Sequence, residues 1–437
     1  MYANQPKFTN YFTEIRDRFD MCNLSNISVI FSGITPKSGG ASYADCDSGI
    51  PFIRSGNIAD DVTTADDADV FIKPEVHTLV MANSQLMHND ILIAIVGATI
   101  GKVGIYKDTR EANINQAIAA VRLNDNSFNC DFVMLYLQSP IGQKYLDYLK
   151  RPVARANINL EEIGSIEIPN VSASIQCRLV EFMNIASQTR SEKLRKADAL
   201  LSGMSDFVCK TLKINLKTET PKLGVGVTMR QLKADKAFNV EYYHSERTIT
   251  IAAVKAVQHK RLGDCVYFMR DIVSANEGQY LGLAGVQSNT GELSGAEDEA
   301  TGQAFVFRAN DVLYCRLRPY LNKVWKAEYD GVCSTEFHVL RMKCNSVLPE
   351  YLSAVMRSTL VLNQSRHMMT GNTHPRITND DVANLLIPVP DMPMQKKIAD
   401  EMRIRRDTVR ALRAEAETEW AAAKAQFERE LLGGTGK

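Results

Sequence analysis

A predicted strand that ends in polar residues is the first stretch whose side chains could do chemistry. Residues 50–58 fit a strand, and Arg54, Ser55 and Asn57 stand at its polar end. Guanidinium, hydroxyl and amide groups are suited to contact the phosphates and base edges of a nucleic acid. The same three residues also fit an ordinary polar strand end, so the pattern leaves both interpretations open.

Two glycine-rich segments are the next candidates for binding a phosphate. Residues 33–40 form a hydroxyl- and amide-rich loop whose backbone N–H groups could meet a phosphate, although most such loops only turn the chain. Residues 97–104 lack the spacing of a Walker loop, because Lys102 is followed by Val103. This second segment instead predicts a hairpin between two strands.

Sets of residues spaced for catalysis are missing from the sequence. There is no Asn/Asp-Pro-Pro-Tyr/Phe tetrapeptide of an amino-methyltransferase, no glycine-rich strand–turn–helix for a methyl donor, and no His/Glu metal cluster. A nuclease set of Asp311, Glu336, His338 and Lys343 is disfavoured, because Glu336 corresponds to Asn115 in the repeat described below. The nine cysteines are scattered without a Cys-x-x-Cys pair, which predicts free thiols and neither a zinc site nor a disulfide framework.

Composition excludes few functions. The chain has 437 residues, enough for two to three domains, and its 51 basic and 51 acidic residues cancel. Binding to nucleic acid or to a membrane would therefore have to use local patches. The longest apolar run, residues 91–96, is far shorter than the roughly 20 residues that span a bilayer, and it predicts a buried strand. The first residues do not indicate secretion.

The last long helix, predicted over residues 395–432, is the element around which the chain is organised. Asp391 and Pro393 suit the start of a helix. Apolar residues then recur in steps of four and three, as in a coiled-coil seam, and charged residues fill the other faces. Such a helix cannot bury its apolar stripe alone and requires a partner helix. The seam positions are Ile398, Met402, Val409, Leu412, Ala416, Trp420, Ala423, Phe427 and Leu431.

An internal repeat supplies the partner helix. At an offset of 219 positions, Pro169 falls on Pro388 and Gln176 falls on Gln395. The match continues without a gap along a second helix, predicted from about Ser174 to Leu212. Two copies of one unit therefore make up the chain.

The two copies share a scaffold and differ in their loops. Where copy one has the hairpin of residues 97–104, copy two has residues 316–323, which add two arginines and a tyrosine. Residues 366–376 are basic, like their counterparts 151–157, and both segments precede an acidic helix start. Divergent loops on a repeated scaffold suit two different half-sites.

The matched helices suggest a spacing device. A helix of about 38 residues extends roughly 60 Å. Matched seams allow antiparallel packing if the two repeats face opposite ways, related by a pseudo-twofold axis. Two similar readers at a fixed separation suit a DNA duplex, whose major-groove faces recur about every 34 Å.

These features closely resemble the specificity subunit of type I restriction–modification systems over nearly the whole chain. The likeness rests on the Ile-Pro-x-Pro-x(4)-Gln-x-x-Ile pattern of residues 387–398, on the Thr-Gly-Asn-Thr-x-Pro-x-Ile segment of residues 370–377, and on Asp90-Ile91-Leu92 with Gly97 and Lys102. Copy one departs from the pattern because its helix start lacks the second proline.

The resemblance implies an α+β (mixed α/β) fold with a pseudo-twofold internal repeat. Each target-recognition domain would be a twisted mixed β-sheet with helices, and two long antiparallel coiled-coil helices would separate the two domains. The implied boundaries are 1–168 for the first domain, 169–213 for the central spacer helix, 214–387 for the second domain and 388–433 for the C-terminal spacer helix.

The resemblance also implies a function without catalysis in this chain. The family's subunit binds a bipartite, asymmetric double-stranded DNA target in which an adenine of each part is methylated. It docks two methyltransferase (modification) subunits and, through them, restriction (translocase) subunits. S-adenosylmethionine, ATP and Mg²⁺ belong to those partners, so this chain is expected to need no cofactor and no metal. A bacterial or archaeal cytoplasm, without a membrane partner, is the implied location.

By the same resemblance, DNA contacts are expected in the loops described above, although any single residue could be an ordinary solvated one. The candidates in the first half are Arg54, Ser55, Asn57, Lys102, Arg155 and Asn157. The candidates in the second half are Arg316, Arg318, Tyr320, Lys323, Asn372, Thr373, His374 and Arg376.

Three other functions compete with this one. A self-sufficient nuclease or methyltransferase is disfavoured by the missing motifs. A coiled-coil scaffold that binds only proteins remains possible, but a mimic of DNA would carry an acidic excess that this chain lacks. A specificity subunit of a methyltransferase-only or type IIB-like complex is the nearest alternative.

Overall fold

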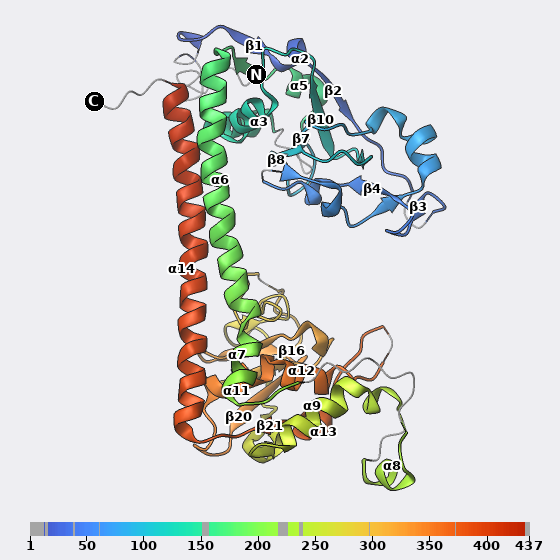
Figure 1. The fold of residues 1–437 in the computed structure, drawn as a ribbon, viewed down its shortest axis with the longest axis vertical. Helices are drawn as coiled ribbons and strands as arrows, with labels where there is room; N and C mark the ends of the chain where they lie inside the picture. The colour runs from blue at the N-terminus through green and yellow to red at the C-terminus, as the bar shows by residue number, and fades with distance from the viewer. Residues whose placement is uncertain are drawn as a thin grey trace, which may run out of the picture. The chain divides into compact units, whose positions relative to one another are not determined.

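Two long helices, α6 (Ala173–Ser202) and α14 (Met392–Leu431), each contribute to both of the units into which the chain folds (Figure 1). Unit 1 comprises Met1–Lys193 and Ala414–Lys437, and unit 2 comprises Leu194–Arg413. The computed structural model describes residues 13, 16–37, 40–60, 62–150, 157–216, 226–235, 239–296, 298–371 and 373–432. Both units combine sheets with helices, so the α+β class predicted from the sequence is confirmed.

Unit 1 is built on two mixed sheets. The larger has the order β2 (Ser28–Ser32), β10 (Ile118–Leu123), β7 (Ile91–Ala94), β8 (Val103–Tyr106) and β5 (Val62–Thr63). The smaller has the order β3 (Tyr43–Ala44), β6 (Phe71–Ile72), β4 (Ile50–Ile53) and β9 (Asn113–Ile114), and β1 (Met21–Asn23) pairs with β11 (Glu167–Pro169). The helices are α2 (Leu24–Ile27), α3 (Cys130–Gln138), α4 (Pro140–Leu149) and α5 (Leu160–Gly164), with short turns η1 (Ser55–Asn57), η2 (Ala65–Asp67), η3 (Val76–Val80) and η4 (Ala82–Ser84).

Unit 2 is also built on two larger sheets and a two-stranded sheet, but its second sheet has a different strand order. Its main sheet has the order β13 (Val266–Met269), β20 (Phe337–Met342), β17 (Val312–Cys315) and β18 (Val324–Lys326). A second sheet has the order β14 (Ile272–Ser274), β16 (Gln303–Phe307), β19 (Gly331–Ser334) and β15 (Tyr280–Leu281), and β12 (His259–Arg261) pairs with β21 (Leu386–Pro388). The other elements are α7 (Met204–Thr211), α8 (Met229–Asp235), α9 (Ser245–Lys255), α10 (Leu262–Cys265), α11 (Pro349–Arg357), α12 (Thr359–Ser365), α13 (Asn379–Ala383), η5 (Glu241–Tyr243) and η6 (Pro319–Leu321).

Buried apolar strands sit at the centre of both main sheets. All four residues of β7 are buried, which confirms the strand predicted from the apolar run. All four residues of β17 are buried as well. A strand whose two faces are both covered reads as a continuous apolar run, because neither face meets water. The hairpin predicted after β7 is also confirmed, since β7 and β8 pair in antiparallel fashion.

The predicted helix seam forms within each unit. In unit 1 the last turns of α14 bury Trp420 and Phe427 in one core with Leu179 of α6. Arg190 pairs with Glu417 at 2.9 Å beside that core, and Lys193 of α6 lies 3.0 Å from Glu415 and 2.6 Å from Glu419. Higher numbers on one helix meet lower numbers on the other, so the two helices are antiparallel here.

Unit 2 has the same antiparallel arrangement at the other ends of these helices. Met204 and Val208 share a core with Ile398 and Met402. Every seam position predicted on α14 is buried except Leu412, which is half-buried. The apolar spacing therefore identified the seam almost completely.

The central helix is interrupted, which the sequence prediction missed. One helix was expected from about Ser174 to Leu212, but α6 ends at Ser202 and α7 begins at Met204. Glycine has a low helix propensity, and the carbonyl of Gly203 accepts a hydrogen bond from Nη1 of Arg405 on α14 at 3.0 Å. The N–H of Phe207 also donates to this carbonyl at 3.2 Å, so helical hydrogen bonding continues past the one-residue break.

A buried aspartate is held by the same pair of bonds in each unit. Arg122 donates from Nε and Nη2 to the two carboxylate oxygens of Asp90 at 2.8 and 2.7 Å. Arg341 donates to Asp311 from the same two nitrogens at 2.8 and 2.7 Å. The internal repeat therefore extends to individual side-chain contacts. Among the described residues, no helix combines the length and the apolar character needed to cross a membrane.

Candidate nucleic-acid interface

The two basic loops of the second half meet through their backbones. Leu317 and Arg376 form a β-bridge although they lie far apart in sequence. The N–H of Ile377 donates to the carbonyl of Arg316 at 3.1 Å, which closes the same contact. The candidate residues of these loops are thereby gathered at one edge of unit 2.

Arg376 is held on this edge by Glu336. Its Nη2 lies 2.7 Å from Oε1 of Glu336, and its Nε donates to both carboxylate oxygens at 3.1 Å. Hydrogen bonding to Glu336 raises the pKa of Arg376, so the guanidinium is charged throughout the accessible pH range. The side chain remains 44% exposed, so it can reach a phosphate or base edge only by sharing or leaving Glu336.

Arg316 is more deeply placed than a surface arginine. Its Nη1 donates to the carbonyl of Thr335 at 3.4 Å, while its Nε is buried without a hydrogen-bond partner among the described residues. It lies beside His338. Burial, and then the charge of Arg316, lower the pKa of His338 to about 3, so this histidine is neutral. Arg316 therefore belongs partly to the fold.

Arg318 adopts a backbone conformation that favours glycine. Its φ is +49°, and the φ of Asn322 is +51°. In unit 1 the equivalent positions, at an offset of 221, are Gly97 and Gly101, both at φ +89°. An exposed arginine at such a position costs backbone energy, and its side chain points away from the buried core. We regard it as the strongest single DNA-contact candidate of unit 2.

The remaining candidates of the second half differ in how exposed their side chains are and in whether those side chains bond to the rest of the fold. Tyr320 is exposed, as are Thr373 and His374. Lys323 is half-buried, and its Nζ donates to the carbonyl of Leu283 at 2.7 Å, which ties it to the fold. Asn372 lies outside the described residues.

The loops of the first half close in the same way. Val96 and Asn157 form a β-bridge, and the N–H of Ile158 donates to the carbonyl of Ile95 at 3.0 Å. This bridge is the counterpart of the one between Leu317 and Arg376. Asn157 is exposed, and Arg155 lies outside the described residues.

Lys102 faces an acidic neighbour on the same unit. Its Nζ lies 3.6 Å from Asp60, whose other carboxylate oxygen lies 3.8 Å from Arg190 of α6. A polar cavity of about 370 Å³ in this unit is lined by Asp60, Lys102, Gln138 and Lys424 of α14, among others. The side chain of Lys102 is therefore partly exposed to solvent but forms an ion pair with Asp60.

Arg54 and Asn57 converge on one carboxylate. Both donate to Asp69, and the side-chain oxygen of Asn57 accepts the N–H of Arg54 at 2.9 Å. Burial raises the pKa of Asp69, but the bonds from Asn57 and Arg54 outweigh it and hold that pKa below its usual value. Ser55 is half-buried in the same turn, η1. Arg54 remains exposed, while Asn57 and Ser55 mainly shape the turn.

The nuclease set considered from the sequence is not assembled as a site. Asp311 is held by Arg341, and Glu336 is held by Arg376. His338 is buried and neutral. Each group has a structural partner or a buried environment, which supports the expectation that this set is not a catalytic centre.

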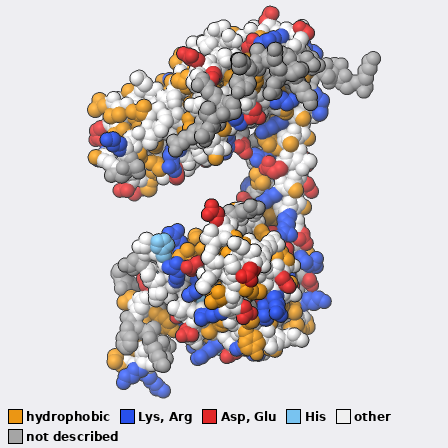
Figure 2. Space-filling view, turned by 180° about the vertical axis from the view of Figure 1, so that it is seen from behind, with side chains coloured by type: hydrophobic (Ala, Val, Ile, Leu, Met, Phe, Trp, Pro, Cys, Tyr) orange, Lys and Arg blue, Asp and Glu red, His pale blue; other side chains and the backbone are white. Residues whose placement is uncertain are grey.

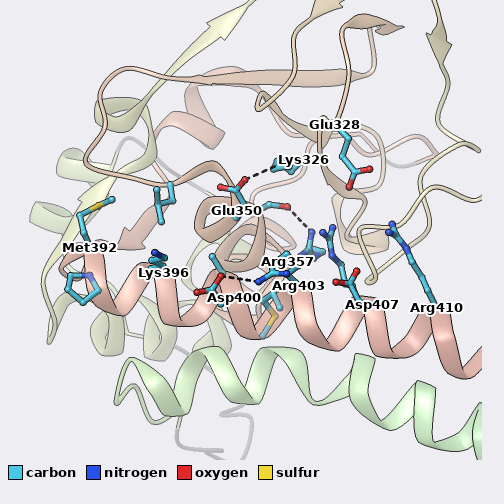
Figure 3. A pocket seen from close by; sticks show the side chains of 16 residues that line it. Lys326, Glu328, Glu350, Arg357, Met392, Lys396, Asp400, Arg403, Asp407 and Arg410 are labelled. Carbon is cyan, nitrogen blue, oxygen red and sulfur yellow. Dashed lines mark hydrogen bonds and ion pairs between the residues drawn. The ribbon is translucent and has the colours of Figure 1, made fainter.

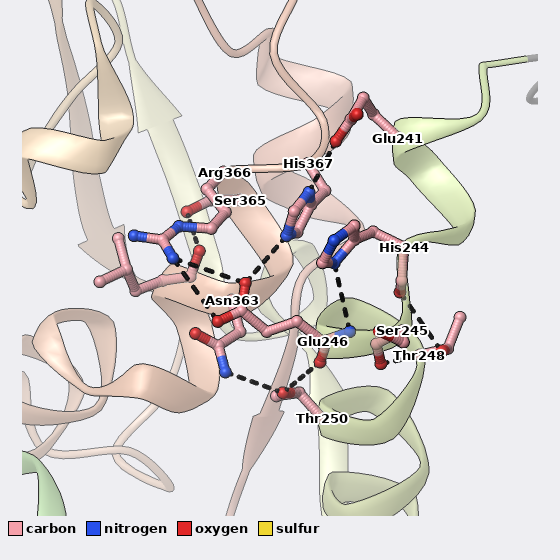
Figure 4. Close-up of polar contacts among 11 residues, drawn as sticks. Glu241, His244, Ser245, Glu246, Thr248, Thr250, Asn363, Ser365, Arg366 and His367 are labelled. Carbon is pink, nitrogen blue, oxygen red and sulfur yellow. Dashed lines mark hydrogen bonds and ion pairs between the residues drawn. The ribbon is translucent and has the colours of Figure 1, made fainter. Parts of the chain in front are cut away.

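The fold brings together a group of possible metal ligands that the sequence motifs did not indicate. The sequence shows no His/Glu cluster, yet His244, Glu246 and His367 converge in unit 2 with ligand atoms within 4.8 Å of one another (Figure 4). The histidines lie more than 120 positions apart, so no sequence spacing could have indicated them.

A charged groove lies in unit 2 along α14 (Figure 3). Its volume is about 1010 Å³, and side chains of α14 such as Lys396, Asp400 and Arg403 alternate in charge along it. On the view of Figure 2, positive and negative side chains are interspersed on both units, in keeping with the zero net charge. Any interaction with a polyanion therefore depends on the local loops.

Comparisons with known proteins agree with this geometry. Residues 19–200 match the model of the type I restriction modification DNA specificity domain. The specificity subunit of the type I restriction enzyme EcoDI of Escherichia coli is 28% identical over 117 residues, which are 26% of this chain and 26% of that protein. The EcoBI specificity subunit of the same organism is 33% identical over 97 residues, 22% of this chain and 20% of that protein. The matches span about a quarter of the length of these relatives.

Solved structures align over a larger share of the chain. The S subunit of a type I restriction–modification system from M. genitalium covers 96% of this chain and 98% of its own, with a TM-score of 0.43 and 11% identity. A chain from a structure of type I restriction–modification complex assembly covers 95% of this chain and 96% of its own, with a TM-score of 0.49 and 14% identity. The family model matches residues 19–200, which are less than half of this chain.

Proposed function

We propose that this chain is the DNA-specificity subunit of a type I restriction–modification complex. Each unit reads one part of a bipartite, asymmetric duplex, and the chain supplies no catalytic residue. The observation that carries the proposal is the pair of equivalent loop closures, Val96 with Asn157 and Leu317 with Arg376. The closures share a backbone geometry, while the bridged residues differ (Val96 and Asn157 against Leu317 and Arg376), as two readers of unlike half-sites should.

The domain boundaries that we propose follow the repeat. Residues 1–168 and 214–387 are the target-recognition domains, and residues 169–213 and 388–433 are the spacer segments. The chain needs no organic cofactor of its own. S-adenosylmethionine, ATP and Mg²⁺ act in the partner subunits, and the complex works in the cytoplasm.

Two copies of one modification subunit dock on a face that recurs on both long helices. Ile185 of α6 is 62% exposed and Ile404 of α14 is 53% exposed, and these residues are equivalent at the offset of 219. Thr189 and Thr408 donate from Oγ1 to the carbonyls of those isoleucines at 2.9 and 2.8 Å. The recurring positions are Arg178 with Lys397, Glu181 with Asp400, Ile185 with Ile404, and Thr189 with Thr408.

The residues of this face take no part in the packing of the helix seam. An exposed isoleucine is not required for folding, and its recurrence at equivalent positions is explained if each helix meets the same partner. Arg403 and Asp407, which lie within a turn of Ile404, add the polar surroundings typical of an interface rim.

Methylome sequencing tests the proposal. The chain is expressed in a host with its modification subunits, and adenine methylation is expected at one bipartite motif. Exchanging residues 316–323 for those of a relative should change one part of that motif and leave the other unchanged. No methylation dependent on the chain, or a change in both parts, would contradict the assignment. Co-purification with or without a translocase subunit separates a complete type I complex from a methyltransferase-only or type IIB-like one.

A further inference from the structure

Two histidines and a glutamate meet at the side of unit 2 where α9 begins and α12 ends (Figure 4). His244 precedes the first turn of α9 and Glu246 lies within it, while His367 follows α12. Their nitrogen and oxygen atoms lie within 4.8 Å of one another, and all three residues are half-buried. Residues from two distant segments are thus placed around one point.

His367 already has the surroundings of a metal ligand. Its Nδ1 lies 3.0 Å from Oε2 of Glu241, and its Nε2 lies 2.9 Å from Oε2 of Glu246. A carboxylate that accepts the Nδ1–H of a histidine fixes the tautomer that presents Nε2, which is the usual outer contact of a metal-bound imidazole. The distance of 2.9 Å is near the roughly 3.3 Å expected between two ligands of a tetrahedral ion.

The other two residues complete the set. Nδ1 of His244 accepts the N–H of Glu246 at 3.3 Å, a long bond that can be given up. The rings of His244 and His367 stack with centroids 4.1 Å apart, so His244 has to turn its ring to share an ion.

We propose that His244, Glu246 and His367 bind one zinc-class divalent ion, with Glu241 as the outer partner of His367. Imidazole nitrogens with one carboxylate favour Zn²⁺, Co²⁺ or Ni²⁺ over Mg²⁺ or Ca²⁺. The ion takes the place of the proton between Nε2 of His367 and Glu246, and that proton is released to solvent. A water molecule fills the fourth position.

The ion would fix the position of the chain segment that leads from His367 to Arg376. His367 stands nine positions before Arg376 in the loop that carries four of the DNA-contact candidates, and Glu246 anchors it to α9. The inference goes beyond the proposed function, and metal binding can be measured without DNA.

Titration of the full chain with Zn²⁺ after removal of metals tests the site. Wild type is expected to bind one more equivalent than His367→Gln and His244→Gln. Glu241→Gln should keep that equivalent and bind it about tenfold more weakly, as loss of an outer partner does. His88→Gln, an exposed histidine of unit 1, is the matched control and should behave like wild type.

Co²⁺ provides a second readout, because the visible spectrum of a tetrahedral nitrogen and oxygen site lacks the thiolate band that the free cysteines would give. Circular dichroism establishes that each variant is folded. Equal Zn²⁺ uptake by wild type and both histidine variants, or a Co²⁺ spectrum with a thiolate band only, would overturn the proposal and leave His367 as a structural ion pair.

Discussion

Gln176 and Gln395 make the same three hydrogen bonds in the two units. Oε1 of Gln176 accepts the N–H of Asn129 at 2.7 Å, and its Nε2 donates to the carbonyls of Ser127 and Val171 at 2.8 and 2.9 Å. Gln395 bonds the equivalent groups: the N–H of Leu348 at 3.0 Å and the carbonyls of Ser346 and Pro390, both at 2.9 Å. Each side chain is 1% exposed. Each glutamine joins a long helix to the loop before a helix of its own unit.

Replacing either glutamine should destabilise only the unit that contains it. Gln176→Leu or Gln395→Leu removes three hydrogen bonds to backbone groups at buried or partly buried contacts, and a loss of about 2–4 kcal/mol is expected from these lost bonds. The chain has two tryptophans, Trp420 in unit 1 and Trp325 in unit 2. In single-tryptophan variants, denaturant unfolding followed by fluorescence therefore reports each unit separately.

The matched control for this experiment is Gln188→Leu. Gln188 is exposed on α6 and donates a hydrogen bond to Glu192 in the next turn, so its loss should change stability by less than about 0.5 kcal/mol. Equal destabilisation by Gln188→Leu and Gln176→Leu would mean that the repeated bonds do not hold the fold.

Arg318→Gly should separate DNA binding from stability. Glycine occupies the equivalent position 97 and tolerates the left-handed conformation, so the variant should be as stable as wild type or more stable by about 1 kcal/mol. Loss of the guanidinium should weaken binding to the cognate duplex by about 1–3 kcal/mol. Gel-shift titration at fixed salt and denaturant unfolding measure the two effects.

Arg403→Ala serves as the control for charge, because Arg403 lies on α14 and pairs with Asp400 at 3.5 Å. It should leave DNA affinity of the isolated chain unchanged. If Arg318→Gly binds as tightly as wild type, Arg318 has to be removed from the contact candidates. Arg316→Ala is a less clean test, because its half-buried side chain also supports the fold.

Because His338 is buried and neutral, unit 2 should be less stable in mild acid than at neutral pH. The histidine's folded pKa of about 3 lies below the ordinary 6.5, so between these values the unfolded chain binds a proton that the folded chain excludes. This contribution is complete above pH 6.5 and is lost as the pH falls, by up to about 1.4 kcal/mol for each pH unit.

His338→Gln should flatten that part of the pH dependence. Unfolding is followed by Trp325 fluorescence at pH 7, 6 and 5, and the difference between wild type and variant cancels the titration of the acidic residues. Parallel curves for the two proteins would show that the buried histidine accepts a proton in the folded state.

The helix seam could be predicted because its signal is local and periodic. Residues such as Ile398, Ala416 and Phe427 recur at helical spacing, and that spacing alone defines one face. The break at Gly203 could not be inferred with the same ease, because a glycine inside a helical pattern is often tolerated without a break. Whether a glycine interrupts a helix is decided by partners that a linear pattern does not contain.

The candidate interface was predicted only in part, for a related reason. Loop composition indicated where basic residues gather, but the pairing of Arg376 with Glu336 and the anchoring of Lys323 by Leu283 depend on segments 40 residues away. The metal-ligand cluster around His367 has no sequence signal at all. By contrast, the left-handed position of Arg318 could have been found, because the offset of 221 places it on Gly97.

The recurring helix face gives a prediction about stoichiometry. Ile185→Lys should remove one of two modification subunits from the complex, and Ile404→Lys should remove the other, because a buried lysine is costly at an interface. The double variant should bind none, while each variant keeps its stability, since both side chains are exposed. Native mass spectrometry of the reconstituted complex counts the subunits. Ile272→Lys, on exposed strand β14, is the control, and two bound subunits in the double variant would place the docking surface elsewhere.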